Sequence, residues 1–383
     1  MAGRIVLFGA TGYTGRLTAE AMVARGMRPL LAARSRGKLE ALAAELGGLE
    51  SAVADVAEPS TVRALVERGD VLVSTVGPFM RWGSAAAAAA STAGAHYLDS
   101  TGEPPVIREV FERYGIAAEQ SGCGMLTAFG YDFVPGNLAG ALALERAGSA
   151  AVRVDVGYFF TGQADPSAMS GGTRASLLGV VAEPGFAYRD GRVQSERGAK
   201  RYRTFPVGGR EQGAVSVGCS EHYGLPRVAP QLREVNGYLG WFGPASRPMQ
   251  VMSAGSSALL KVPGAAGVWQ KLSARIAPGS SGGPDAAARA RQGSHIVGVA
   301  YDAGGNELAQ AHVSGADGYT FTARILAWGA KQAAAGALRG TGALGPVDGF
   351  GLRELEAGCA EAGLEEQGAD RAAAAEQPVV ARP

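Results

Sequence analysis

Three glycines near the N-terminus, Gly9, Gly12 and Gly15, have the spacing that a phosphate-binding loop requires. The first lets the chain turn away from a strand, and the second lets the backbone come close to a pyrophosphate. The third lets the following helix pack against the strand, so that the N-terminal amides of the helix point at the anion. A buried-strand pattern over residues 4–8 precedes the glycines, and a helical pattern over 16–25 follows them. Together these features predict a dinucleotide-binding loop.

The alternative is a plain tight turn, because glycine accounts for 58 of the 383 residues and such triplets also arise by chance. A second strand pattern at residues 29–33, Pro-Leu-Leu-Ala-Ala, ends where a strand–helix–strand unit should end. This context favours the dinucleotide site.

Arg34 directly follows the second strand and indicates which dinucleotide is bound. An acidic residue there would accept hydrogen bonds from the ribose 2′-hydroxyl of NAD, whereas a basic residue accommodates the 2′-phosphate of NADP. Arg36 and Lys38 add positive charge close by. The alternative is a solvated basic turn that opens the next helix. We predict that the cofactor is NADP (NADPH).

Residues after three later strands are further candidates, because ligands of open α/β sheets lie outside the carboxyl ends of the strands. Asp55 and Val56 follow the third strand, where they would meet the adenine. Residues 75–79 follow the fourth strand, near the expected nicotinamide ribose, and residues 101–103 follow the fifth. For Glu103, the alternative is a position beside a capped helix start.

The predicted cofactor-binding residues are Gly9, Ala10, Thr11, Gly12, Tyr13, Thr14, Gly15, Arg34, Ser35, Arg36, Lys38, Asp55, Val56, Thr75, Val76, Gly77, Pro78, Phe79, Thr101, Gly102 and Glu103.

Tyr131 and Asp132 are the candidate catalytic residues. They follow the last strand of the first half and precede a helix that has Pro135 in its first turn. Tyr131 would donate a proton or orient a substrate carbonyl, and Asp132 would position it. Alternatively, Asp132 caps the following turn and Tyr131 packs between domains. The chain has no Tyr-x-x-x-Lys pair, so it lacks the proton relay of short-chain dehydrogenases.

Composition excludes several other function classes. The net charge of +1 gives no support for nucleic-acid binding. Three scattered cysteines argue for a reducing compartment and against a disulfide scaffold, and the four histidines form no metal-binding pattern. The chain starts directly with a core strand, so we expect no signal peptide. The alanine-rich stretch 84–95 is too short to span a bilayer. We therefore expect a cytoplasmic protein with no transmembrane segment and no metal.

The first 145 residues alternate strand-like and helix-like segments, which predicts an α/β fold with a doubly wound parallel sheet of the Rossmann type. From Val152 onward, apolar and polar residues alternate instead, and turns at 188–193 and 302–306 indicate hairpins. A second domain built on a largely antiparallel sheet is therefore predicted. Further helices are expected at 167–181, 319–338 and 352–363, and the segment 263–285 is expected to be a mobile excursion.

Several motifs together resemble the saccharopine dehydrogenase-like superfamily, and most closely its branch of trans-acting enoyl reductases of polyketide-lipid synthesis. The motifs that carry the resemblance are the loop 9–15, the turn at Arg34, Gly-Pro-Phe at 77–79, Tyr-Leu-Asp-Ser-Thr-Gly-Glu at 97–103, Gly-Tyr-Asp-Phe-Val-Pro at 130–135 and Gly-Tyr-Thr-Phe-Thr-Ala at 318–323. The resemblance extends to about residue 364.

The resemblance implies a Rossmann domain with an inserted α+β domain, and C-terminal helices that pack back on the Rossmann half. The implied activity is NADPH-dependent reduction of a C=C bond in a free or carrier-bound acyl intermediate. One alternative is an imine or opine-type oxidoreductase acting on a C–N bond, although we find no basic cluster suited to an amino-dicarboxylate. Another alternative is a non-catalytic NADPH sensor.

The expected domain organisation follows from both lines of reasoning. We assign residues 1–148 to the dinucleotide-binding domain and 149–318 to a substrate domain that also mediates homodimerisation. Residues 319–364 form the returning helices, and 365–383 form a disordered tail, because they contain too few apolar residues.

Overall fold

A parallel sheet of seven strands forms the first half of the fold in the computed structural model, which describes residues 3–162, 184–259 and 282–368. Its strand order is β15-β6-β5-β4-β1-β2-β3, so the order reverses between β1 and β4. A crevice at such a reversal is where doubly wound sheets bind their ligands. The strands are β1 (Ile5–Phe8), β2 (Leu30–Ala33), β3 (Ser51–Val53), β4 (Val71–Ser74), β5 (His96–Asp99), β6 (Gly124–Leu126) and β15 (Gly342–Ala343).

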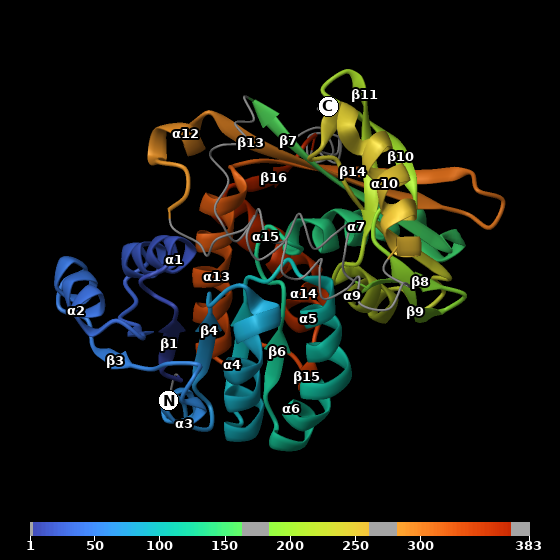
Figure 1. The fold of residues 1–383 in the computed structure, drawn as a ribbon. Coiled ribbons are helices and arrows are strands. Elements are labelled where there is room, and N and C mark those ends of the chain that lie inside the picture. Colours follow the sequence, from blue (N-terminus) through green and yellow to red (C-terminus); the bar gives the residue numbers. More distant parts are fainter. Residues whose placement is uncertain (1–2, 163–183, 260–281, 369–383) are drawn as a thin grey trace, which may run out of the picture.

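Helices cover both faces of this sheet because successive strand residues point to opposite sides. In β1, Leu7 packs into one apolar cluster with α1 and α13, whereas Val6 and Phe8 pack into another with α3, α4 and α6. The helices of this half are α1 (Tyr13–Ala24), α2 (Arg36–Glu45), α3 (Pro59–Arg63), α4 (Phe79–Ala93), α5 (Pro104–Glu109), a π-helical turn (Val110–Tyr114), α6 (Gly115–Ser121) and the returning α13 (Gly318–Ala334). Figure 1 shows α13 beside α1 on one side of the sheet.

The second half is a nine-stranded sheet of order β10-β11-β12-β7-β13-β14-β16, with the β8–β9 hairpin attached through β12. Its neighbouring strands pair antiparallel, apart from the parallel pair β12 and β7. The strands are β7 (Arg153–Gly162), β8 (Pro184–Arg189), β9 (Arg192–Arg197), β10 (Tyr202–Val207), β11 (Arg210–Val217), β12 (Glu234–Leu239), β13 (Gln292–Tyr301), β14 (Glu307–Gly315) and β16 (Leu364–Glu366).

Helix α7 (Val134–Ala147) joins the two halves and packs against the second sheet. The approach is close, because a Cβ atom added to Gly298 of β13 would collide with the carbonyl oxygen of Ala139. A single apolar cluster contains Leu126 of the first sheet, residues of α7 and Val156 of the second sheet. The other helices of this half are α9 (Glu221–Val228), α10 (Ser246–Leu259), α12 (Ala286–Ala290), α14 (Pro346–Phe350) and α15 (Leu352–Ala362).

The predicted fold class is confirmed, including the change from a parallel to a largely antiparallel sheet. The hairpins predicted around 188–193 and 302–306 are present. The helix expected at 319–338 ends at Ala334, and Gly336 has a positive φ of 77° that no helix continues through. The helix expected at 167–181, and most of the segment 263–285, lie outside the described residues.

Two strands differ from the sequence-based expectations. Glu365 and Glu366, which we expected in the tail, belong to β16, where they pair with Ser314 and Val313 of β14. β16 forms because its backbone hydrogen-bonds to the edge strand β14, which is present only once the second sheet has folded. The two-residue strand β15 was not predicted, because it is shorter than any periodic pattern can reveal. The domain boundaries at residues 148 and 318 remain predictions.

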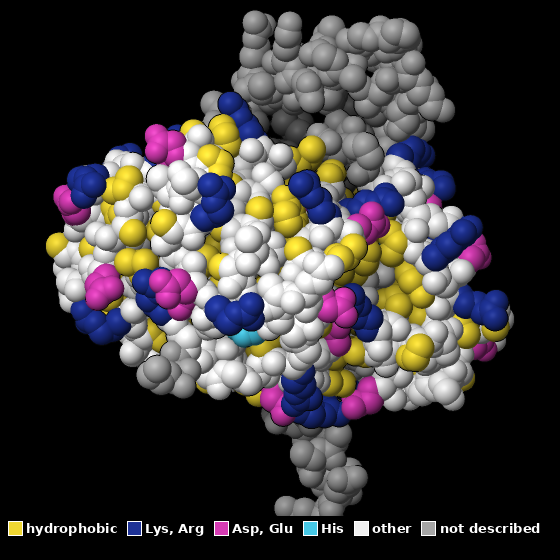
Figure 2. Space-filling view, turned by 90° about the horizontal axis from the view of Figure 1, so that it is seen from below, with side chains coloured by type: hydrophobic (Ala, Val, Ile, Leu, Met, Phe, Trp, Pro, Cys, Tyr) yellow, Lys and Arg dark blue, Asp and Glu magenta, His cyan; other side chains and the backbone are white. Residues whose placement is uncertain are grey.

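Acidic and basic side chains are interspersed on the face that Figure 2 shows. Within the described ranges, no helix combines the length and the apolar character needed to cross a membrane. The same residues contain no group of three or more His, Cys, Asp or Glu side chains that could hold a metal ion. The cysteines Cys123, Cys219 and Cys359 are buried free thiols.

Candidate functional site

The Gly-rich loop forms a tight cradle between β1 and α1. Gly9 has a φ of 91°, and a Cβ atom there would lie 2.8 Å from Oγ1 of Thr75. A Cβ atom on Gly15 would collide with the carbonyl oxygen of Gly9. Helix α1 begins at Tyr13 and has no acidic residue in its first turn that would compete with an anion for its N-terminal amides. This geometry fits the pyrophosphate of a dinucleotide.

The basic turn after β2 leaves two of its three cations, Arg34 and Lys38, without an ion-pair partner among the described residues. Arg34 is exposed and has no ion-pair partner among the described residues. Arg36, in contrast, lies 3.7 Å from the carboxylate of Glu40 one helical turn away. Lys38 is exposed on α2, and Ser35 is the N-cap residue of that helix. Of the two unpaired cations, Arg34 directly follows β2 and is the better placed for a 2′-phosphate at the carboxyl edge of the sheet, whereas Lys38 lies on α2.

The turn after β3 is closed by Asp55. Its Oδ1 accepts a hydrogen bond from the backbone N–H of Ala57 at 3.0 Å, and its own N–H donates to Oγ1 of Thr61 at 3.0 Å. Val56 is half-buried and packs against the apolar cluster below the sheet. Both residues thus lie at the carboxyl edge of the sheet, as the adenine site would require.

Glu103 connects the loops after β4 and β5. Its two carboxylate oxygens accept hydrogen bonds from the backbone N–H groups of Phe79 and Met80, each at 2.8 Å. Burial raises the pKa of Glu103, and these two hydrogen bonds oppose the rise. Glu103 is the N-cap residue of α5, and its carboxylate also lies at the N-terminus of α4. Through this contact it holds the turn 77–79.

Asp99, which the sequence analysis did not single out, ties the loops after β5 and β6 together. It is fully buried and accepts hydrogen bonds from the N–H of Thr101 at 3.0 Å, the N–H of Ala128 at 2.8 Å and the hydroxyl of Thr127 at 2.9 Å. Burial raises its pKa. The sequence feature that could have identified Asp99 is an acidic residue at the end of an apolar strand. A carboxylate is buried at such a position only when hydrogen bonds offset the loss of hydration.

Tyr131 forms part of an aromatic wall. Its ring stacks on Phe160 at 5.8 Å and lies 6.1 Å from Trp241, centroid to centroid. Its hydroxyl donates to the carbonyl oxygen of Phe159 at 3.4 Å, and its own N–H donates to Thr322 of α13. Burial raises the pKa of Tyr131 far above its ordinary value, so the hydroxyl holds its proton firmly.

Asp132 has the chemistry of an acid–base group. The residue is partly exposed, but its Oδ1 atom is buried and has no hydrogen-bond partner among the described residues. Its Oδ2 atom lies so near the loop after β5 that a Cβ atom on Gly102 would be 2.7 Å away. Burial raises the pKa of Asp132 to about 7. A carboxyl group that is half protonated at neutral pH can donate or accept a proton.

A second buried carboxyl group, Glu221, lies behind Asp132 and was also missed by the sequence analysis. Its Oε1 accepts from the hydroxyl of Tyr158, which is also 3.3 Å from the carbonyl oxygen of Phe133. Its Oε2 has no partner in the described part of the chain. Burial raises the pKa of Glu221 to about 7, and the charge of Asp132 contributes to this rise. The residues around Glu221 in the sequence do not indicate that it is buried, because the elements that bury it, β7 and α7, are distant in the chain.

An open groove of about 640 Å³ lies next to the aromatic wall. This volume is within the roughly 300–1,000 Å³ typical of small-molecule sites. The end of β7, the β10–β11 hairpin and the turn at 243–244 line the groove. Phe160 belongs both to the groove and to the wall around Tyr131. The groove therefore borders the aromatic wall at Phe160.

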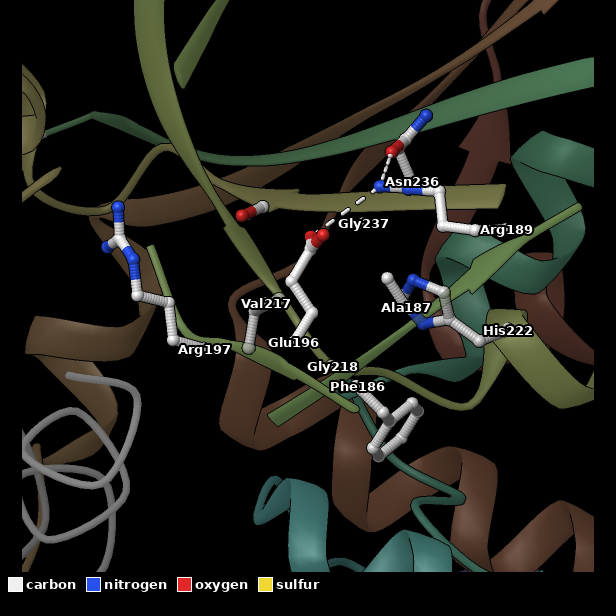
Figure 3. Close-up of a pocket in the computed structure, with 11 residues that line it drawn as sticks. Phe186, Ala187, Arg189, Glu196, Arg197, Val217, Gly218, His222, Asn236 and Gly237 are labelled. Carbon is white, nitrogen blue, oxygen red and sulfur yellow. Dashed lines mark hydrogen bonds and ion pairs between the residues drawn. The ribbon is translucent and has the colours of Figure 1, made fainter. Parts of the chain in front are cut away.

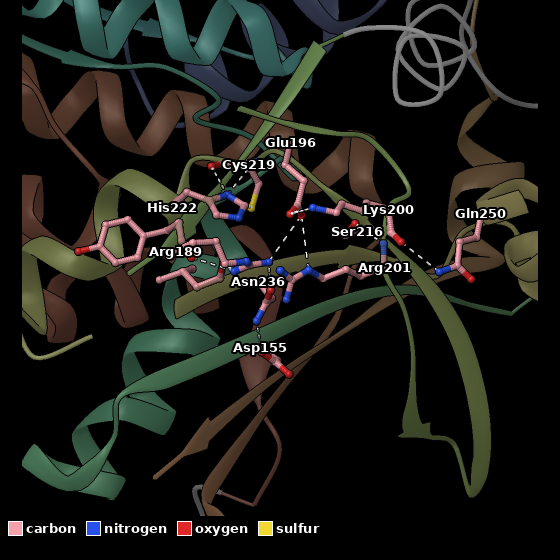
Figure 4. Close-up of polar contacts among 12 residues, drawn as sticks. Asp155, Arg189, Glu196, Lys200, Arg201, Ser216, Cys219, His222, Asn236 and Gln250 are labelled. Carbon is pink, nitrogen blue, oxygen red and sulfur yellow. Dashed lines mark hydrogen bonds and ion pairs between the residues drawn. The ribbon is translucent and has the colours of Figure 1, made fainter. Parts of the chain in front are cut away.

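The second sheet contains a basic cluster that the sequence analysis did not find. Glu196 is within 4 Å of three cations, Arg189 at 3.7 Å, Lys200 at 2.9 Å and Arg201 at 3.5 Å. Figure 3 shows Arg189 directed at Glu196 and Asn236 in a small pocket, and Figure 4 shows the wider network. Glu196 carries one negative charge, so it pairs with all three cations without neutralising them.

The sequence-predicted segments meet at one edge of the first sheet. Direct contacts link the loop 9–15 to Thr75, the turn 77–79 to Glu103, and Gly102 to Asp132. The residues after β2 and β3 lie farther along the same edge, since these strands pair in order beside β1.

Comparison with known proteins identifies relatives of both halves. The family model described as the saccharopine dehydrogenase NADP binding domain matches residues 5–123. A protein named putative trans-acting enoyl reductase from Mycobacterium tuberculosis is 30% identical over 377 residues, covering 84% of this chain and 86% of the relative. A trans-acting enoyl reductase from Mycobacterium ulcerans is 38% identical over 140 residues, covering 35% of this chain and 34% of the relative.

Among solved structures, the saccharopine dehydrogenase (L-Glu forming) of Saccharomyces cerevisiae has a similar fold. The TM-score is 0.59 at 13% sequence identity, with 95% of this chain and 99% of that chain covered. At this identity the likeness concerns the fold alone.

Proposed function

Because this chain belongs to the trans-acting enoyl reductase branch of the saccharopine dehydrogenase-like superfamily of NADP-dependent oxidoreductases, we propose that it reduces the C=C bond of an enoyl intermediate. The observation that carries the proposal is the unpartnered Oδ1 of Asp132, a buried carboxyl oxygen beside the aromatic wall and at the sheet edge where a nicotinamide would lie.

The residues at the sheet edge suit NADPH. The glycine cradle would hold the diphosphate, Arg34 the 2′-phosphate, and the turn 77–79 with Gly102 the nicotinamide end. NADPH bound there would supply a hydride. The rings of Tyr131, Phe160 and Trp241 would limit the access of water to the reacting carbons.

Asp132 is the proposed proton donor. Reduction of an enoyl thioester adds a hydride to the β-carbon and a proton to the α-carbon. Asp132, with its pKa near 7, would give the proton from Oδ1 and regain one from solvent through its partly exposed side. Tyr131 would orient the substrate as part of the wall, because its raised pKa makes it a poor acid at neutral pH.

The groove beside Phe160 is the proposed site of the acyl chain. Its opening to the surface would admit a chain that is either free or attached to a carrier. For the imine alternative, Arg189 offers no support, since Glu196 and Asn236 already engage it. We also propose that the protein is cytoplasmic. We further propose that it forms a homodimer through the second domain, and measurement of its molecular mass in solution would test the dimer.

The test is NADPH consumption with enoyl thioesters, compared with imines formed from an amino acid and a keto acid. We expect consumption with enoyl thioesters. The variant Asp132→Asn should lower kcat by about 10²–10⁴-fold and leave NADPH binding unchanged. Asp190→Asn, at an exposed turn, is the control. Turnover of imines alone would overturn the proposed substrate class, and full activity of Asp132→Asn would remove Asp132 from the mechanism.

A further inference from the structure

A segment of the second domain lies on the Gly-rich loop of the first. Residues 282–285 and helix α12 precede β13, yet they contact Tyr13, the first residue of α1. Figure 1 shows α12 above α1. The hydroxyl of Tyr13 donates to the carbonyl oxygen of Pro284. Arg289 of α12 donates to the same hydroxyl at 2.8 Å and to the carbonyl of Pro284 at 2.9 Å. We call this set of contacts the clasp.

The clasp fits closely around the ring of Tyr13. A Cβ atom on Gly283 would lie 2.5 Å from Cε1 of that ring, so only glycine permits this approach. On another side, the ring of Tyr319 at the start of α13 meets Tyr13 edge-on at 5.2 Å. Pro284 is itself buried. The position of Tyr13, and with it the start of α1, is thus coupled to the second domain.

Arg289 brings an unneutralised positive charge to the phosphate-binding end of α1. Residues 9–15 contain no cation. Arg16, the next residue, is engaged by Glu20 and Glu45. Arg289 has no carboxylate partner among the described residues, and it is only partly buried. Its fixed contacts are to a hydroxyl and a carbonyl oxygen, so no carboxylate occupies its guanidinium.

We propose that Arg289 is a cofactor-binding residue that the second domain contributes, and that its guanidinium binds the diphosphate of the dinucleotide. Guanidinium groups present paired donors that match phosphate oxygens. The amides of α1 and Arg289 would then meet the diphosphate from two domains. Cofactor binding would consequently tighten the clasp. The inference rests on dinucleotide binding by the Gly-rich loop and is independent of the substrate that is reduced.

The test is equilibrium titration of the full-length protein with NADPH, NADH, ADP and 2′-AMP. Arg289→Ala should weaken NADPH, NADH and ADP by the same factor, about tenfold to a hundredfold, because all three carry the diphosphate. Binding of 2′-AMP, which has a 2′-phosphate and no diphosphate, should be unchanged. Arg289→Lys should retain part of the affinity. Arg291→Ala, an exposed arginine next to the same helix, is the matched control.

Two results would overturn the proposal. One is unchanged affinity of Arg289→Ala for NADPH and ADP. The other is an equal loss for 2′-AMP, which would mean that the variant disturbs the whole nucleotide site. Tyr13→Phe separates the two parts of the clasp, since it removes the hydroxyl and keeps Arg289. We expect it to retain diphosphate selectivity. A failure of enoyl reduction with normal nucleotide titrations would affect the proposed function and leave this inference intact.

Discussion

At the scale of single residues, charge compensation separates binding groups from structural ones. Arg34 and Arg36 are two residues apart, yet Arg36 faces Glu40 while Arg34 faces no carboxylate in the described chain. The same distinction applies to the carboxyl groups, because Glu103 has two donors and Asp132 has an unpartnered oxygen. Unpaired polar groups of this kind are costly, and they concentrate at functional sites.

Arg34→Ala should weaken NADPH binding by about tenfold to a hundredfold, because it removes a charged hydrogen-bond partner of the 2′-phosphate. NADH, which lacks that phosphate, should bind as before. Isothermal titration calorimetry with both nucleotides measures the ratio of their dissociation constants in the variant and in the unmodified protein. Arg36→Ala is the control, and its expected effect is small because Glu40 already engages that side chain. Equal affinity of Arg34→Ala and the unmodified protein for NADPH would contradict the assignment.

At the scale of elements, buried carboxylates fasten the loops that line the site. Glu103, in the loop after β5, caps α4, which follows β4. Asp99, at the end of β5, binds the loop after β6. Because neighbouring parallel strands end at the same edge of the sheet, each carboxylate can hydrogen-bond to the loop that follows the next strand. The nicotinamide end of the site is thereby held as one unit.

Glu103→Ala should destabilise the fold by about 1–2 kcal/mol, because the first two N–H groups of α4 lose their acceptors. NADPH affinity should also fall, since the turn 77–79 is no longer held. Glu103→Gln keeps one acceptor oxygen and should show a smaller loss. Urea unfolding measures the stability. Glu58→Ala is the matched control, because Glu58 precedes α3 without a side-chain hydrogen bond; similar losses in both alanine variants would argue against capping by Glu103.

At the scale of the whole molecule, the two sheets share one apolar core through α7. Glu221 lies where α9, β7 and α7 meet, with Tyr158, Cys219 and Asp132 as the neighbouring titratable groups. A carboxyl group buried at such a junction affects the free energy of unfolding of the entire fold.

Raising the pH should therefore cost stability. The pKa of Glu221 is about 7 in the folded protein and near 4.5 in the unfolded chain. Between these values the unfolded chain loses the proton and the folded protein keeps it, so stability falls as pH rises from about 4.5 to 7. The loss attributable to Glu221 is on the order of 3 kcal/mol.

Urea unfolding at pH 5 and pH 8 measures this loss. Glu221→Gln, which stays neutral and retains an acceptor for Tyr158, should lose less stability between the two values than the unmodified protein. Glu145→Gln, at an exposed position, should behave like the unmodified protein. If Glu221→Gln kept the full pH dependence, the buried charge would not be its source.

Features that depend on short stretches of chain were predictable from the amino-acid sequence alone. Strand, glycine loop and helix follow one another within residues 4–25, so the phosphate-binding unit and the parallel half of the fold were predictable from spacing. The basic turn after β2 and the change of period near Val152 are likewise local. The family motifs added the NADP-binding domain, which the matching family model supports.

Which groups are buried, paired or left free depends on long-range contacts in the folded protein. Glu221 has an ordinary local sequence, and β7 and α7, which bury it, come from elsewhere in the chain. Arg289 is 276 residues away from Tyr13, whose hydroxyl it contacts. Burial and charge compensation are properties of neighbours in space, and long-range packing sets those neighbours independently of the local pattern.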